Sequence, residues 1–124
     1  MTEAADLRGA RILVLEDDYY LARDLQDALE GAGATVLGPF GAEADARHAL
    51  DAMRPDCALL DVNLGAGISF SFPDTLAERS IPFAFVTGYD RGVIPDAFAA
   101  VERLEKPVEP DRIQAAAARL LASG

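Results

Sequence analysis

The fold is decided by the stretch Ile12-Leu13-Val14-Leu15-Glu16-Asp17-Asp18, in which an uninterrupted apolar run ends in consecutive carboxylates. A continuous apolar run is typical of a strand that is buried on both faces, as in a parallel sheet. Asp17 or Asp18 is suited to cap a helix that begins directly afterwards. The stretch therefore predicts a buried strand, an acidic turn and a helix in succession.

Similar apolar runs recur along the chain. They are Cys57-Ala58-Leu59-Leu60, Phe83-Ala84-Phe85-Val86, a short segment from Thr35 to Leu37 and a weaker run from Val101 to Leu104. We expect the short segment to end at Gly38-Pro39, where the chain turns. Helical patterns separate these runs, and strict alternation of strands and helices predicts an α/β fold with helices on both faces of a parallel sheet.

The helical patterns differ in clarity. The first carries Leu21, Leu25, Ala28, Leu29 and Ala32 on one face, and the last carries Ile113, Ala116, Ala117, Leu120 and Leu121. The first should stop at Gly31 or Gly33, and the last has Pro110 in its opening turn. Residues 42–53 and 73–79 predict two more helices, the second opened by Ser71 and a proline. Residues 88–100 contain Gly92 and Pro95, so we expect an irregular loop there, or one or two helical turns after Pro95.

Composition narrows the classes of function. The 124 residues suffice for one domain, and the net charge of -10 argues against direct binding to nucleic acid. No apolar stretch is long enough to span a membrane, and the N-terminus does not resemble a signal peptide. The single cysteine, Cys57, excludes an intramolecular disulfide and suits a reducing compartment. We therefore expect a cytoplasmic domain over residues 11–122, preceded by a tail over residues 1–10.

Polar residues follow the apolar runs at the points where the strands should end. They are Glu16, Asp17 and Asp18 after the first strand, Asp61 after the third, Thr87 after the fourth and Lys106 after the fifth. Parallel strands bring these ends to one edge of the sheet, where α/β proteins bind ligands. Crowded carboxylates repel one another unless a cation compensates, and Mg²⁺ prefers such oxygen ligands. Lys106 and Thr87 suit the oxygens of a transferring phosphoryl group, which leaves an Asp as the nucleophile.

Each of these residues also has an ordinary interpretation when taken alone. The acidic cluster can be a helix cap, and Asp61 a turn residue at the end of a strand. Thr87 can be a buried hydroxyl bonded to backbone, and Lys106 a solvated surface lysine. The ordered set at one sheet edge favours the chemical interpretation.

The ordered set resembles the receiver domain of bacterial two-component response regulators over about Arg11 to Leu121. The resemblance is carried by the first stretch above together with Leu59-Leu60-Asp61-Val62-Asn63-Leu64, Phe85-Val86-Thr87-Gly88 and Leu104-Glu105-Lys106-Pro107. It implies a flavodoxin-like, five-stranded sheet of order 2-1-3-4-5. It also implies that Asp61 accepts a phosphoryl group, and that Mg²⁺ is held by Glu16, Asp17, Asp61 and the backbone carbonyl of Asn63. Thr87 would contact the phosphoryl oxygens, and Lys106, before a usually cis bond to Pro107, would pair with Asp61.

The segment Pro82-Phe83-Ala84-Phe85-Val86-Thr87-Gly88-Tyr89 further resembles a receiver subgroup whose fourth strand reads Phe-Ala-Thr-Gly, with Val86 in place of the alanine. Members of this subgroup are often paired with kinases of the HWE or a related type. Many receivers have an aromatic switch residue where this chain has Arg103. We therefore expect Thr87 to act without an aromatic partner there, and phosphorylation to reshape residues 88–100 instead. Gly65 to Phe72 is a second candidate switch, unless Phe70 and Phe72 fold onto the core.

The resemblance implies a stand-alone receiver, a monomer or weak homodimer, that catalyses only its own phosphorylation and dephosphorylation. Its partners would be a sensor histidine kinase or a histidine phosphotransfer protein and a downstream protein, unless it drains phosphate from a branched relay. A phosphorylation-independent interaction module and a small aspartyl phosphohydrolase are the alternatives. The second lacks the usual general acid two residues after the nucleophile, where this chain has Asn63. We expect His48 to be a solvated helix residue and Cys57 a core residue.

Overall fold

The computed structural model describes residues 6–61, 63–64, 67–68, 70–88 and 94–123, with backbone only at residues 63–64 and 67–68. Five parallel strands form the main sheet: β1 (Arg11–Leu15), β2 (Thr35–Phe40), β3 (Cys57–Asp61), β6 (Phe83–Thr87) and β7 (Arg103–Glu105). Their order is β2-β1-β3-β6-β7, so every strand pair is parallel and the first strand lies inside the sheet. The predicted order 2-1-3-4-5 is confirmed.

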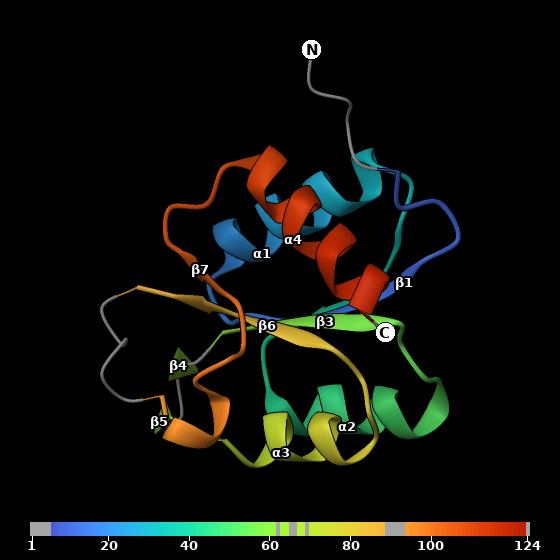
Figure 1. The fold of residues 1–124 in the computed structure, drawn as a ribbon. Helices are drawn as coiled ribbons and strands as arrows, with labels where there is room; N and C mark the ends of the chain where they lie inside the picture. Colours follow the sequence, from blue (N-terminus) through green and yellow to red (C-terminus); the bar gives the residue numbers. More distant parts are fainter. Residues whose placement is uncertain (1–5, 62, 65–66, 69, 89–93, 124) are drawn as a thin grey trace.

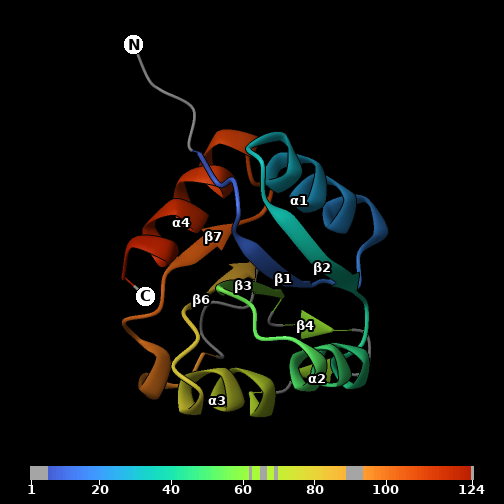
Figure 2. The ribbon, with the colours of Figure 1, turned by 90° about the vertical axis from the view of Figure 1, so that its right-hand side faces the viewer.

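The helices cover both faces of this sheet (Figure 1). Helices α1 (Tyr19–Gly31) and α4 (Pro110–Ser123) lie on one face, and α2 (Glu43–Ala52) and α3 (Ser71–Glu78) lie on the other (Figures 1 and 2). Among the described residues, no helix has the length and apolar character needed to cross a membrane.

Side-chain alternation along the strands creates two separate cores. Under α1 and α4 the core contains Ile12 and Val14 of β1 with Ala84 and Val86 of β6. Under α2 and α3 it contains their neighbours in the strand, such as Leu13 and Phe85. The central strands are therefore buried on both faces, which explains their continuous apolar runs. Leu7, before β1, is also buried and donates its backbone N–H to Ala32 O at 2.9 Å.

The helix boundaries agree with the predicted caps at most points. Asp18 caps α1, because its Oδ1 accepts the backbone N–H of Leu21 at 3.0 Å. Helix α3 begins at Ser71, two residues before the predicted start at Pro73, and Phe70 occupies the N-cap position, so the serine hydroxyl does not cap the helix. Its hydroxyl contacts α2 instead.

The predicted end of the second strand at Gly38-Pro39 was wrong, because β2 continues to Phe40. The register between β1 and β2 shifts there, so that Leu15 pairs with Phe40, and Gly38 adopts a φ of +100°. Since β2 is an edge strand, the missing N–H of Pro39 breaks no hydrogen bond inside the sheet. The bulge and the glycine together carry the strand through the proline.

The weakest predicted helix is reduced to η2, a single 3₁₀ turn over Asp96–Phe98. This agrees with the expectation of one or two turns after Pro95, while residues 89–93, including Gly92, lie outside the described part. Two short strands were not predicted, β4 (Asn63–Leu64) and β5 (Gly67–Ile68), which pair antiparallel after β3.

Candidate functional site

Three carboxylates meet at the carboxyl end of the two central strands. Glu16 and Asp17 directly follow β1, and Asp61 is the last residue of β3. Because β1 and β3 are neighbours in the sheet, these strand ends bring the carboxylate oxygens within 4.8 Å of one another. Asp17 is exposed, whereas Glu16 and Asp61 keep only 2% and 6% of their surface accessible. The cluster is thus open to solvent on the Asp17 side.

Lys106 supplies the positive charge of the site. It follows β7, and its Nζ lies 3.4 Å from Asp61 Oδ1 and 3.5 Å from Glu16 Oε1. Its backbone N–H donates to Thr87 O at 2.8 Å, which aligns the ends of β7 and β6. The bond to Pro107 is cis, as the resemblance implies. Burial acts to lower the pKa of Lys106, but the charges of Glu16 and Asp61 outweigh it and the pKa is raised.

The pKa of the buried Glu16 carboxyl lies well above its ordinary value. The pKa of Glu16 is raised from 4.5 to about 8. The largest cause is desolvation by burial, and the second is the hydrogen bond with Asp61. The backbone N–H of Asp18, which donates to Glu16 Oε2 at 3.1 Å, and the charge of Lys106 oppose this rise. A divalent cation that binds Glu16 would displace its proton and favour the charged carboxylate.

Thr87 ends β6, the strand between β3 and β7. Its side chain is fully buried, and its hydroxyl has no hydrogen-bond partner within the described part of the chain. A buried polar group without a partner is uncommon and calls for an explanation. A ligand oxygen at the sheet edge would provide one.

The donor set fits a hard divalent cation. Glu16, Asp17 and Asp61 offer carboxylate oxygens, the ligand type of Mg²⁺, and Mg²⁺ needs only one or two of them beside water. The buried acidic cluster is therefore compatible with the metal site of a receiver domain. Asn63 follows two residues after Asp61 as the first residue of β4, so its backbone stays near the strand end.

Solved structures of other proteins share this fold. SdrG from Sphingomonas melonis Fr1 is 34% identical, with a TM-score of 0.80 over 97% of this chain and 99% of SdrG. The BeF3-activated conformation of SdrG from Pseudomonas melonis Fr1 is 36% identical, with a TM-score of 0.77 over 90% and 95% of the two chains. The PhyR response regulator REC domain of Erythrobacter litoralis has a TM-score of 0.81 at 22% identity, which shows the fold. The chain belongs to the response-regulator receiver family.

One curated relative extends beyond the receiver. The phyllosphere-induced regulator PhyR of Methylorubrum extorquens is 32% identical over 127 residues, which are 95% of this chain and 45% of that protein. The chain thus spans about half the length of the curated relative that it matches. No protein-family model matches the chain.

The other residues singled out from the sequence lie away from the carboxylate cluster or outside the described part of the chain. Arg103 lies on β7, exposed and paired in register with Phe85 of β6, so no aromatic ring occupies this position. His48 is exposed on α2, and Cys57 is buried in β3, where burial raises the pKa of its thiol to about 12. Both agree with their expected structural roles. Tyr89 and Gly65 lie outside the described residues.

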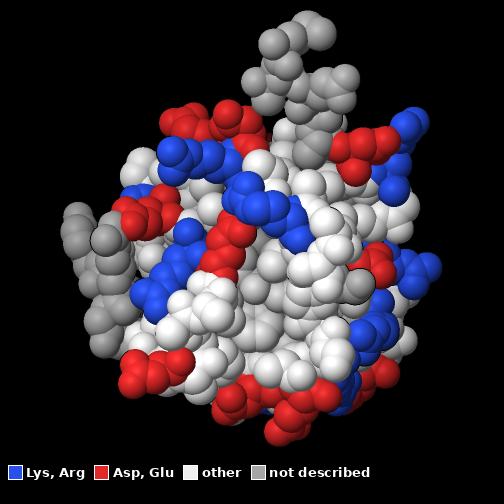
Figure 3. Space-filling model, in the orientation of Figure 1, with Lys and Arg blue, Asp and Glu red and all other residues white. Residues whose placement is uncertain are grey.

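Charge on the receiver surface is mixed. On the face shown in Figure 3, acidic and basic side chains are interspersed, and acidic ones gather along the lower edge near α2 and α3. Over the described residues of this face there is no continuous basic surface of the kind that binds phosphate backbones.

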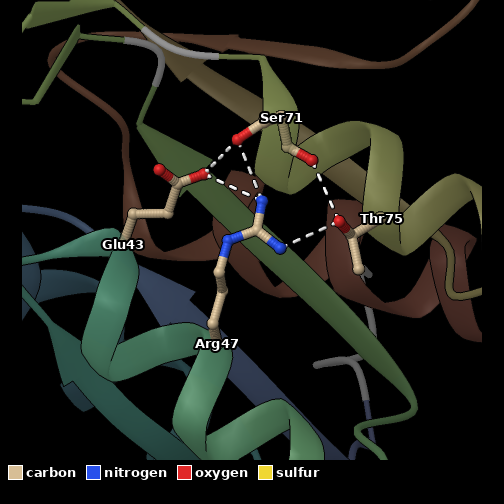
Figure 4. A network of polar contacts seen from close by, with 4 residues as sticks. All are labelled: Glu43, Arg47, Ser71 and Thr75. Carbon is tan, nitrogen blue, oxygen red and sulfur yellow. Dashed lines mark hydrogen bonds and ion pairs between the residues drawn. The ribbon is translucent and has the colours of Figure 1, made fainter.

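Two groups of residues were missed by sequence reasoning. One is a polar network between α2 and α3, in which Arg47 contacts Ser71 and Thr75 (Figure 4). The other is a cluster of phenylalanines that includes the stacked pair Phe70 and Phe98. The i,i+4 spacing of Glu43 and Arg47 is compatible with their ion pair on one helix, and this is the one local signal of the network. No local pattern indicated contacts between separate elements.

Proposed function

We propose that this receiver accepts a phosphoryl group on Asp61 in a Mg²⁺-dependent reaction. The observation that carries the proposal is the approach of Glu16, Asp17 and Asp61 within 4.8 Å, with the Lys106 ammonium 3.4 Å from the Asp61 carboxylate. A buried carboxylate beside a cation site and a lysine is suited to attack phosphorus, because both positive charges stabilise the charge of the transition state.

The donor in this proposal is a phosphohistidine on a sensor kinase or a histidine phosphotransfer protein. An Asp61 oxygen forms the new P–O bond while the P–N bond to the donor imidazole breaks, and the departing imidazole takes up a proton. Glu16, Asp17, Asp61 and the Asn63 carbonyl would hold Mg²⁺, which supplies positive charge to the phosphoryl oxygens when bound. The Thr87 hydroxyl donates a hydrogen bond to one of these oxygens. Later hydrolysis by water returns Asp61 to a carboxylate.

The proposal makes the chain a signalling domain rather than an enzyme with a separate substrate. Its output is contact with a downstream protein or the draining of phosphate from a relay. The Phe83–Thr87 strand supports membership of the Phe-Ala-Thr-Gly subgroup, with a kinase of the HWE or a related type as donor. A cytoplasmic location belongs to the same proposal and suits the free, buried Cys57.

The test is phosphorylation by a small-molecule phosphodonor such as phosphoramidate, followed by intact mass spectrometry. Wild type with Mg²⁺ should gain one phosphoryl group, and Asp61→Asn or a chelator should abolish the gain. Asp18→Asn is the matched control, since asparagine also caps helices and Asp18 lies outside the carboxylate cluster. No gain in wild type would favour the interaction module. Turnover of a phosphomonoester that is lost in Asp61→Asn would favour the phosphohydrolase.

A further inference from the structure

Four phenylalanines pack together on the α2–α3 face of the sheet: Phe70, Phe83, Phe85 and Phe98, here called the aromatic cluster. Phe70 and Phe98 are stacked, with centroids 5.9 Å apart and an interplanar angle of 24°. Phe98 also meets Phe85 edge-on at 5.7 Å, and Phe70 meets Phe85 edge-on at 6.1 Å. Phe83 completes the cluster at 5.9 Å from Phe98.

The aromatic cluster joins the two chain segments that leave the phosphoacceptor site. Phe70 lies at the start of α3, in the segment that follows Asp61, and Phe98 ends η2, in the segment that follows Thr87. Figures 1 and 2 show η2, drawn in orange, beside α3. Phe83, Phe85 and Thr87 alternate along β6 and therefore share one face of the sheet. A change at Thr87 thus begins at one end of the row of side chains against which Phe98 packs.

The two segments differ in how firmly they are held. The first turn of α3 is tied to α2, because Ser71 Oγ donates to Glu43 Oε1 at 2.9 Å and accepts from Arg47 at 2.9 Å (Figure 4). In contrast, η2 is a single turn in which Phe98 is the buried side chain; residues 95–97 are exposed, and the next buried side chain is Ile94, which precedes the turn. Phe98 is therefore a main anchor of η2, and Phe70 is the ring stacked on it.

We propose that the stacked pair Phe70–Phe98 couples the start of α3 to η2, so that the two segments respond together to the state of Asp61. The pair takes the place of the aromatic switch at position 103, where this receiver has an exposed arginine. The coupling rests on the proposed function, because phosphorylation of Asp61 is its input. Its structural part, the link between α3 and η2, is measurable without phosphate.

The first experiment measures amide hydrogen exchange of the metal-free chain in wild type, Phe70→Leu and Phe98→Leu. The amides of Ala99 and Val101 are hydrogen-bonded within the η2 segment, and that of Asp74 is bonded to Phe70 O. Phe70→Leu should speed exchange at Ala99 and Val101 about threefold to tenfold, as expected for a lost ring pair, and Phe98→Leu should do the same at Asp74.

The matched control is Phe40→Leu, which shortens another half-buried phenylalanine packed on the same core. It should leave all three amides unchanged. Reciprocal acceleration in the two cluster variants supports the coupling. Acceleration that stays on the substituted segment, or that Phe40→Leu reproduces, overturns it.

The second experiment adds Mg²⁺ and beryllofluoride, a mimic of aspartyl phosphate, and records amide NMR spectra. In wild type, the amide resonances of Thr87 and Lys106 at the site should shift, together with those of Ala99 and Val101. Phe70→Leu should keep the site shifts and lose most of the shifts at Ala99 and Val101. Full η2 shifts in Phe70→Leu overturn the coupling. If wild type shows no site shift, the proposed function fails, and the exchange experiment alone decides the structural link.

Discussion

The ammonium of Lys106 lies 3.4 Å from Asp61 Oδ1, although one strand separates their strands in the sheet. The contact is possible because Lys106 follows β7 and reaches past the end of β6 to the end of β3. The contact therefore places the Lys106 ammonium where a negatively charged phosphoryl group on Asp61 would lie. Lys106 is also the single lysine of the sequence.

The pKa of Lys106 should be above the ordinary lysine value in the metal-free protein, because Glu16 and Asp61 stabilise its charged form. Reductive ¹³C-dimethylation labels this lysine and the chain terminus, so an NMR pH titration reads the Lys106 pKa directly. Asp61→Asn should lower that pKa and Asp18→Asn should not. A Lys106 titration unaffected by Asp61→Asn would show that the ion pair is absent in solution.

The metal-free receiver should lose stability as the pH rises from about 4.5 to about 8. Glu16 has a pKa of about 8 in the folded protein and regains its ordinary value of 4.5 on unfolding. Between these values the folded state binds more protons, so the free energy of unfolding falls with rising pH. Urea denaturation in chelator at several pH values measures the slope.

Glu16→Gln should flatten this slope, because glutamine does not titrate. Glu78→Gln, at an exposed position on α3, is the control and should leave the slope as in wild type. Equal slopes in Glu16→Gln and wild type would assign the pH dependence to other groups.

Binding of Mg²⁺ should release a proton near neutral pH and become tighter as the pH rises. The reason is that the cation binds the ionised carboxylates, whereas the pKa of about 8 keeps Glu16 mostly protonated in the metal-free protein. Isothermal titration in two buffers of different ionisation enthalpy counts the released protons. Identical heats in both buffers would contradict the prediction.

Replacing Thr87 should change the rate of phosphorylation without lowering the free energy of unfolding. Its buried hydroxyl has no partner among the described residues, so Thr87→Val should leave the free energy of unfolding unchanged or raise it by about 1 kcal/mol. Phosphorylation by phosphoramidate should slow by about tenfold or more, since a hydrogen bond to the phosphoryl oxygens is lost. Thr87→Ser keeps the hydroxyl and should restore most of the rate. Undiminished phosphorylation of Thr87→Val would remove Thr87 from the mechanism.

Arg47 should stabilise the contact between α2 and α3. Its guanidinium donates to Thr75 Oγ1 at 3.0 Å and to Ser71 Oγ at 2.9 Å, and it lies 5.5 Å from the centroid of the Phe72 ring. Arg47→Ala should lower the free energy of unfolding by about 1–2 kcal/mol. The control Arg23→Ala breaks an exposed pair with Asp27 at 3.9 Å and should cost less than about 0.5 kcal/mol. If both variants lost the same free energy of unfolding, the network would contribute no more to stability than an exposed ion pair.

The amino-acid sequence by itself determined the alternation of strands and helices and the line of functional residues at the strand ends. Continuous apolar runs predicted the central strands, and an Asp at 17 or 18 and Pro110 predicted helix starts, because burial on two faces and capping leave local patterns. Parallel order then brings Asp61, Thr87 and Lys106 to one edge, whatever their exact contacts. The candidate site was therefore predictable as a set of residues.

Tertiary structure decided which side chains meet across elements. The end of β2 depended on its pairing with β1, which carries the strand through Pro39 to Phe40. The stacking of Phe70 on Phe98 and the contact of Arg47 with Ser71 join segments whose own patterns contain no reference to one another. Local periodicity predicts which face of its own helix or strand a residue occupies. A contact between two segments also depends on how the sheet positions them relative to each other.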